Sequence, residues 1–139
     1  MSICYVDTSV ILRIVFGEKN PFKKWDLFDS AYSSSVIRVE ALRTIDRLRL
    51  QGQLSDEELA IRVKALNEMM RSIGEVELTP IVLAKASDPF STVVRTLDAI
   101  HLASAILLRD NKEGSITFLT HDRQQDIAAT ALGFATLQI

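Results

Sequence analysis

A carboxylate stands in the middle of an otherwise apolar run near the start of the chain. The run from Cys4 to Leu12 contains Asp7 as its single acidic residue. Charged side chains are almost never fully buried without a partner, so Asp7 must cap a helix, reach water or hold a ligand. Asp122 raises the same question, because it closely follows a second β-rich apolar run at residues 116–119. Both acids therefore mark the end of a predicted strand as a place where chemistry could occur.

Two further acids occupy the first turns of predicted helices. Glu40 lies one turn inside a helix expected at residues 36–50, to one side of its buried stripe. Asp98 begins a helix at 97–108 that is apolar on every side and is therefore expected to be buried. Taken singly, each acid also has a structural interpretation. It could cap a helix or complement a helix dipole, and Glu40 could pair with Arg43 one turn on.

Strands and helices alternate along the chain, which predicts how these acids are positioned. We expect strands at residues 2–6, 31–35, 75–78, 115–119 and 134–137. We expect helices at 10–16, 21–29, 36–50, 55–73, from 80 to a break at 88–89, at 97–108 and at 122–132. This alternation predicts an α/β fold with a mostly parallel sheet covered by helices on both faces. Right-handed crossovers gather the strand-to-helix turns at one edge, where ligands bind in such sheets.

The four acids should therefore converge at the carboxyl edge of the sheet. Converging carboxylates repel, so a fold keeps them together only where a cation or protons neutralise them. Oxygen ligands at a water-filled edge favour Mg²⁺ or Mn²⁺, which also bind the phosphate oxygens of a substrate. Such an ion polarises a phosphodiester and lowers the pKa of a bound water. The pattern predicts metal-dependent hydrolysis that leaves a 5′-phosphate and a 3′-hydroxyl.

Composition indicates one compact domain over residues 1–139. A single cysteine excludes an internal disulfide, no run approaches the roughly 18 apolar residues of a membrane span, and no export signal is evident. We therefore expect a cytoplasmic protein that makes no use of a membrane. The net charge of −2 does not favour a nucleic-acid binder. Arginines nevertheless gather at residues 38–49, and we expect Arg43 and Arg47 either to contact phosphate groups or to pair with neighbouring acids.

The sequence resembles PIN-domain proteins of the VapC toxin type from end to end. The segments YVDTS, SSVIRVEALR, LDAIHLASA and LTHDR carry this resemblance in the same order and spacing. It implies a PIN-like three-layer fold and a Mg²⁺-dependent endoribonuclease that acts on RNA as a toxin and is held in check by a cognate antitoxin. The resemblance assigns metal binding and catalysis to Asp7, Glu40, Asp98 and Asp122, and contacts to metal-bound water or phosphate to Ser9 and Thr120.

Three other functions compete with the nuclease. An aspartyl-phosphate phosphatase would use Asp7 as nucleophile, but such sites usually carry another acid two residues later, where Ser9 stands. A receiver domain would need a lysine after a late strand, whereas Lys112 precedes that strand. A catalytically inactive PIN-fold protein that only binds a partner would be indicated by the loss of one of the four acids, and none is lost.

Several other residues receive a structural interpretation. His101 lies on a mostly apolar helix, His121 lies on an exposed turn, and Cys4 lies on a predicted central strand, so none of them is assigned to the site. An apolar stripe also runs along the helix at 55–73. It could face the core, a second copy in a homodimer, or the antitoxin, and we favour the core; its members are Leu59, Val63, Leu66, Met70 and Ile73.

Overall fold

A five-stranded parallel sheet forms the centre of the molecule. The computed structural model describes residues 1–112 and 114–139. The strands are β1 (Ser2–Val6), β2 (Ser30–Ser34), β3 (Gly74–Val76), β4 (Ser115–Leu119) and β5 (Ala135–Thr136), arranged in the order β3-β2-β1-β4-β5. Every strand pair is parallel. The α/β prediction is confirmed, and the sheet is parallel throughout the described residues.

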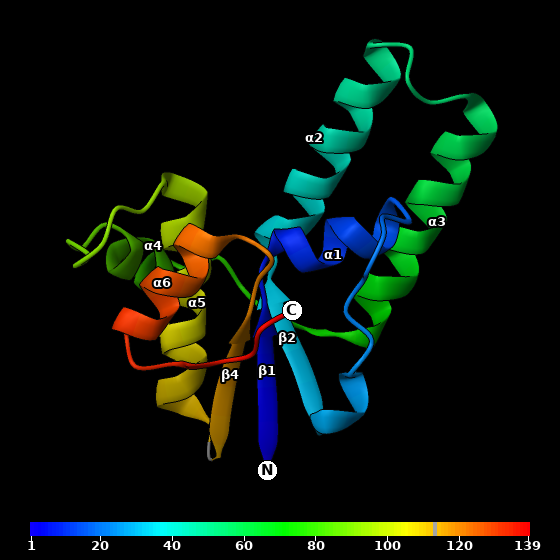
Figure 1. The fold of residues 1–139 in the computed structure, drawn as a ribbon. Coiled ribbons are helices and arrows are strands. Elements are labelled where there is room, and N and C mark those ends of the chain that lie inside the picture. Colours follow the sequence, from blue (N-terminus) through cyan, green and yellow to red (C-terminus); the bar gives the residue numbers. More distant parts are fainter. Residues whose placement is uncertain (113) are drawn as a thin grey trace.

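Helices cover both faces of this sheet and give three layers (Figure 1). One face carries α1 (Thr8–Val15), α2 (Val36–Leu50) and α3 (Asp56–Ser72). The other face carries α5 (Thr96–Asn111) and α6 (Arg123–Ala131), with α4 (Pro80–Ala86) packed beside α5. Among the described residues, no helix combines the length and the apolar character that crossing a bilayer requires.

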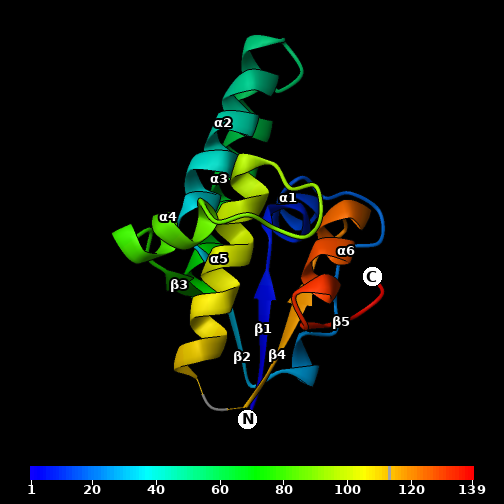
Figure 2. The same ribbon diagram turned by 90° about the vertical axis from the view of Figure 1, so that its left-hand side faces the viewer.

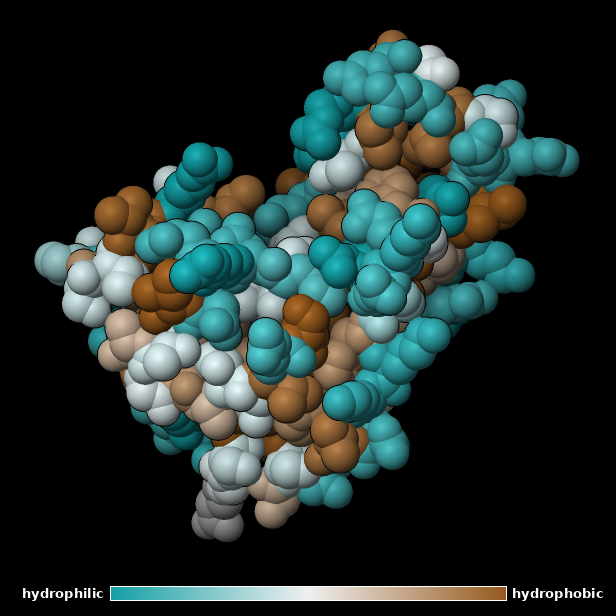
Figure 3. All heavy atoms as spheres, viewed as in Figure 1, coloured by the Kyte–Doolittle hydropathy of each residue, from teal (hydrophilic) through white to brown (hydrophobic). Residues whose placement is uncertain are grey.

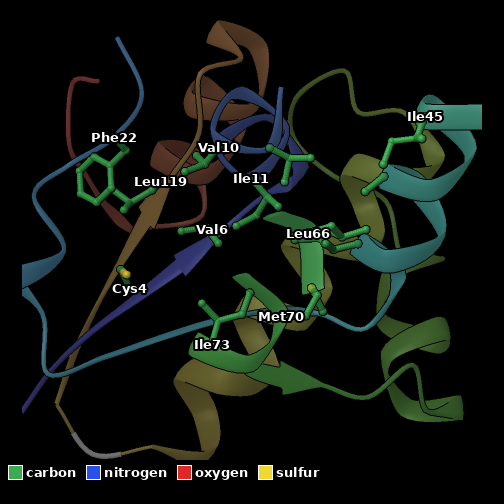
Figure 4. Close-up of a cluster of buried hydrophobic side chains, with 13 residues drawn as sticks. Cys4, Val6, Val10, Ile11, Phe22, Ile45, Leu66, Met70, Ile73 and Leu119 are labelled. Atoms are coloured by element: carbon green, nitrogen blue, oxygen red, sulfur yellow. The ribbon is translucent and has the colours of Figure 1, made fainter. Parts of the chain in front are cut away.

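The central strand β1 supplies both hydrophobic cores. Successive side chains of a strand point to opposite faces. Accordingly, Ile3 and Tyr5 pack against α5 and α6, whereas Cys4 and Val6 pack against α1 to α3 (Figure 4). Cys4 is fully buried, and this burial raises the pKa of its thiol to about 12. The interpretation of Cys4 as a small core residue is confirmed.

The helix predicted at residues 21–29 is wrong. Only a short 3₁₀ turn, Trp25–Leu27, forms in this segment. After α1 the chain must return to the beginning of the sheet before β2 starts, and an extended segment spans about twice the distance per residue of a helix. The segment is fastened there by Asp29, whose amide donates to the Ser2 carbonyl at 2.8 Å and whose carboxylate accepts from the Ser2 amide at 2.8 Å.

The helices α2 and α3 form an antiparallel hairpin, here called the arm, that extends beyond the carboxyl edge of the sheet (Figures 1 and 2). The predicted bounds of α2 agree residue for residue, and Ser55 caps α3 as its sequence indicates. The predicted apolar stripe packs inward: Leu66, Met70 and Ile73 are buried in the core, and Leu59 and Val63 pack against it. The core interpretation of the stripe is confirmed, so this stripe is not a surface for a homodimer or an antitoxin.

Candidate active site

A cleft of about 930 Å³ opens at the carboxyl edge of the sheet. Its walls come from α2, from the start of α5 with the loop before it, and from the start of α6. In the space-filling view the molecule is hollowed between the arm and the opposite helices (Figure 3). Three of the four predicted acids line this cleft, and the full lining is Glu40, Val93, Arg95, Thr96, Leu97, Asp98, Asp122 and Gln124.

The fourth acid, Asp7, lies beside the cleft and is almost fully buried, with 4% of its surface exposed. Its backbone continues β1 and hydrogen-bonds to the end of β4, and its side chain caps α1 by accepting from the Ser9 amide at 3.1 Å. Burial raises the pKa of the Asp7 carboxyl, against the opposing effect of hydrogen bonds from Ser9 and Thr120. The capping interpretation of Asp7 is therefore correct, although it does not explain why the cap is a buried acid.

Two hydroxyl groups hold the Asp7 carboxylate from opposite sides. Ser9 Oγ donates to Oδ1 at 2.5 Å and Thr120 Oγ1 donates to Oδ2 at 2.5 Å. The hydroxyl oxygens of Ser9 and Thr120 also accept hydrogen bonds from the chain after β4. The His121 amide donates to Ser9 Oγ at 2.9 Å, and the Asp122 amide donates to Thr120 Oγ1 at 3.0 Å. Ser9 and Thr120 thus join the ends of β1 and β4 around Asp7, which is a positioning role in this structure. Their predicted contact with phosphate or metal-bound water stays a prediction.

Glu40 is held by a separate set of hydrogen bonds. Its Oε1 accepts from Thr8 Oγ1 at 2.7 Å and lies 2.8 Å from His101 Nε2. The suggested ion pair of Glu40 with Arg43 is wrong, because Arg43 bonds to Asp46 at 3.2 Å instead. Arg43 and its i,i+3 partner Asp46 lie toward solvent. Glu40 instead faces the sheet edge from the margin of the buried stripe.

Asp98 differs from these acids in having no partner of its own. Within residues 1–112 and 114–139, no hydrogen bond or ion pair involves its carboxylate. It does not cap α5, because the N-cap position is Arg95. Burial and then the negative charges of Asp122 and Glu40 raise the pKa of the Asp98 carboxyl, against His101 and Arg95. A helix-capping role does not account for Asp98.

Asp122 is the most exposed of the four acids. Its Oδ1 caps α6 by accepting from the Gln125 amide at 3.1 Å, so the capping interpretation is correct for one oxygen. Its charge also acts on Asp98 across the cleft, as the raised pKa of that acid indicates. Gln125 in turn connects the two helices, because its side-chain amide donates to the Asp98 carbonyl at 3.1 Å. The starts of α5 and α6 are thereby tied together.

The donor set of this edge fits a hard divalent cation. All four side chains offer carboxylate oxygens, which Mg²⁺ and Mn²⁺ prefer. In the part of the chain that the structure describes, no three His, Cys, Asp or Glu residues are close enough together to form a ready-made metal site. Burial raises the pKa of the Asp98 carboxyl most, and the negative charges of Asp122 and Glu40 raise it further, so the carboxylates of this edge repel one another.

The structure adds residues that the sequence interpretation left out of the site. His101 and Thr8 contact Glu40 directly, and Arg95 lines the cleft. A usable signal existed for His101, because it follows Asp98 by three residues and so lies about one helical turn on, on the same side. No comparable signal existed for Arg95, which precedes its helix in a segment without periodicity.

The other residues weighed for the site lie elsewhere or have other partners. His121 is not part of the cleft lining; it lines a neighbouring hollow beside the C-terminal residues, which shares Asp122 with the cleft. Arg43 and Arg49 both bind the carboxylate of Asp46. Arg47 is exposed on the arm and, among the described residues, makes no ion pair. Arg47 is therefore the better of the two predicted arginines for contact with a phosphate.

Comparisons with known proteins agree with this arrangement. The model of the PIN domain family matches residues 4–131, which include all four acids. The curated protein Ribonuclease VapC47 of Mycobacterium tuberculosis (strain CDC 1551 / Oshkosh) is 26% identical over 139 residues, covering 95% of this chain and 93% of that protein. The family match extends over nearly the whole chain, and the parallel sheet with three-layer packing agrees with it. The protein belongs to the PIN-domain family.

Proposed function

We propose that this protein is a Mg²⁺-dependent endoribonuclease that hydrolyses RNA phosphodiester bonds. The observation that supports this most is Asp98, a carboxylate on a cleft wall that has no hydrogen-bond partner among the described residues and whose pKa is raised by burial and then by the charges of Asp122 and Glu40. A bound cation would relieve the repulsion between these like charges, and helix capping accounts for Asp7 and Asp122 but not for Asp98. RNA is the chosen substrate because of the family and because the relative is named a ribonuclease.

In this proposal the four acids hold the divalent ion and share the catalytic work. When bound, Mg²⁺ or Mn²⁺ would neutralise charge on the phosphodiester and lower the pKa of a water molecule, so that the water could lose a proton and attack the phosphorus. Asp7 would act as the fixed member, because Ser9 and Thr120 already orient both of its oxygens. Asp98 and Asp122, which line the cleft, would adjust their side-chain positions to the bound ion. The 2′-hydroxyl takes no part, so the products are a 5′-phosphate and a 3′-hydroxyl.

Basic residues around the cleft are proposed to hold the RNA backbone. Arg95 lies on the cleft wall beside Asp98, and its guanidinium can bind a phosphate through two parallel hydrogen bonds. Arg47 extends the positive charge along the arm, and the paired Arg43 contributes less. Among the described residues that line the cleft, Arg95 is the one basic side chain, so we expect a modest affinity for RNA in the absence of the divalent ion.

We further propose that the protein is the toxin of a toxin–antitoxin pair, that it acts in the cytoplasm, and that it forms a homodimer bound by a cognate antitoxin. The family and the VapC name of the relative support this role. The arm also exposes apolar side chains that could be covered by a partner, namely Val39, Leu42, Leu50 and Ile61. Co-expression with the neighbouring gene tests this: co-purification of a small protein is expected, and a monomer that captures none would contradict it.

The decisive test of the activity uses labelled RNA and matched variants. The purified chain should cleave structured or unstructured RNA in the presence of Mg²⁺ or Mn²⁺. It should not cleave RNA in the presence of a chelator, and the Asp98→Asn variant should not cleave RNA at all. The product ends should be a 5′-phosphate and a 3′-hydroxyl, so 2′,3′-cyclic phosphate ends would reject the hydrolytic mechanism. Cleavage of DNA but of no RNA would reject the substrate. The absence of any cleavage, with all four acids present, would favour the inactive partner-binding alternative.

A further inference from the structure

A buried chain of hydrogen bonds leads from the sheet to Glu40. The Tyr5 hydroxyl lies 2.8 Å from His101 Nδ1, and His101 Nε2 lies 2.8 Å from Glu40 Oε1. Tyr5 is fully buried on β1, and His101 on α5 is 2% exposed. The chain thus connects three elements, β1, α5 and α2, and it ends at a carboxylate that lines the cleft.

The contacts of Glu40 determine where the imidazole carries its hydrogen. A carboxylate only accepts hydrogen bonds, so a ring nitrogen 2.8 Å from Oε1 must carry a hydrogen atom. Thr8 Oγ1 also lies 2.9 Å from this nitrogen. Because Thr8 gives its own hydroxyl hydrogen to Glu40, its oxygen can accept from the same N–H. The Nε2–H therefore points at the Glu40–Thr8 pair.

Tyr5 completes this assignment from the other side of the ring. A neutral imidazole with hydrogen on Nε2 has an acceptor at Nδ1, and Tyr5 then donates its hydroxyl hydrogen there. The ring is also packed edge-on to Tyr5, with centroids 5.9 Å apart. Tyr5 thus fixes both the tautomer and the orientation of His101.

As a consequence, the two carboxylate oxygens of Glu40 differ in their hydrogen bonds. Both hydrogen bonds reach Oε1, and in the described residues none reaches Oε2. Hydrogen bonds behind a ligating carboxylate orient it, and their loss typically weakens metal binding about 10- to 100-fold. We propose that His101, oriented by Tyr5, is a positioning residue that fixes Glu40 Oε1 and leaves Oε2 free for a divalent cation. This inference rests on the proposed function.

Metal affinity is the readout that a merely structural role of His101 would not change. We would titrate Mn²⁺ and follow the free ion by electron paramagnetic resonance, using the full chain and variants shown to be folded by thermal melting. His101→Leu should weaken Mn²⁺ binding by roughly ten- to a hundredfold. His101→Gln, which can still offer an N–H, should recover part of that loss. Tyr5→Phe should weaken binding less, and Tyr32→Phe, a matched change outside the chain of bonds, should leave it unaltered.

A second measurement, made with Tyr5, Glu40 and His101 intact, does not depend on metal. Long-range ¹H–¹⁵N spectra report which ring nitrogen carries hydrogen, and His121→Gln removes the one other histidine signal. We expect hydrogen on Nε2 of His101, and a lone pair there would overturn the inference. Equal Mn²⁺ affinities in the folded Leu, Gln and Phe variants would overturn it as well. Failure of the parent protein to bind Mn²⁺ would instead refute the proposed function, and this inference with it.

Discussion

Two halves of the cleft edge, the surroundings of Asp7 and those of Asp98, differ in how they stabilise a negative charge. Around Asp7 every side-chain oxygen is bonded, and the hydroxyls that hold it are themselves bonded to the chain after β4. Around Asp98 the described residues supply no hydrogen bond, and the nearby charges of Asp122 and Glu40 are repulsive. The first half is built for stability as well as position. In the second half, no hydrogen bond among the described residues stabilises the charge of Asp98, although Asp122 itself caps α6.

The largest effect that tests this contrast is expected in catalysis. Asp98→Asn retains the shape of the side chain but removes a charge needed for the cation, so RNA cleavage should fall by about a hundredfold or more. Cleavage rates measured at saturating Mg²⁺ check this. Asp88→Asn, an exposed acid outside the lining of the cleft, is the control and should cleave normally. Undiminished cleavage by Asp98→Asn would contradict the proposed role of Asp98 in binding the cation.

A smaller but clear effect is expected from the bonded half. Thr120→Val keeps the side-chain shape and removes the hydroxyl, which leaves Asp7 Oδ2 and the Asp122 amide each without a partner. Leaving a buried polar group unsatisfied costs about 1–3 kcal/mol. Chemical denaturation should show a loss of this size in the free energy of unfolding. Thr130→Val, on the exposed side of α6, should change stability by far less, and equal losses in both variants would contradict the positioning role of Thr120.

The pH dependence of stability should also separate the halves. The folded-state pKa of Asp98 is raised, so folded protein holds that proton more tightly than unfolded protein does. Between the unfolded and the folded pKa, stability of the metal-free protein should therefore fall as pH rises, and the penalty persists above the folded pKa. Because Asp98 is partly exposed, solvent screening makes this penalty small. Asp98→Asn should flatten this part of the curve, and an unchanged curve would contradict the raised pKa, which burial and then the charges of Asp122 and Glu40 produce.

The smallest effect is expected from the arm. Arg47→Ala should weaken RNA binding by a few-fold and reduce its dependence on salt, because one phosphate contact is lost. Arg43→Ala should change binding less, since Asp46 already neutralises that guanidinium. Filter binding over a range of salt concentrations measures both. A greater loss in Arg43→Ala would reverse the assignment made from the ion pairs.

Much of the architecture could be predicted from the sequence because it depends on local rules. Helix caps such as Ser55 and the apolar period of α2 fix where elements begin and end, and alternation of strands and helices predicts the parallel sheet. Residues 21–29 were mispredicted because their conformation is set by the distance that the chain must cover to reach β2. That distance is a property of the whole fold, and no local pattern contains it.

The position of the four acids could be predicted from the sequence, whereas their hydrogen-bond partners could not. Spacing and topology place all four acids at one edge of the sheet, and three of them line one cleft. The bonds of Glu40 to Thr8 and His101 join residues separated by 32 and 61 positions, so only the assembled layers bring them together. The Asp46 pairs of Arg43 and Arg49 were foreseeable as i,i+3 contacts, but for Arg43 the sequence alone could not choose between Asp46 and Glu40.

The central claim is that the open half of the edge binds a divalent cation, and thermal melting with and without Mg²⁺ tests it most directly. A ligand that binds only the folded state raises the melting temperature by mass action. We predict that Mg²⁺ raises the melting temperature of the parent protein and raises that of Asp98→Asn much less, while metal-free Asp98→Asn is as stable as the parent or more so. An Asp98→Ala variant that is clearly destabilised, still cleaves RNA and still responds to Mg²⁺ like the parent would contradict the claim.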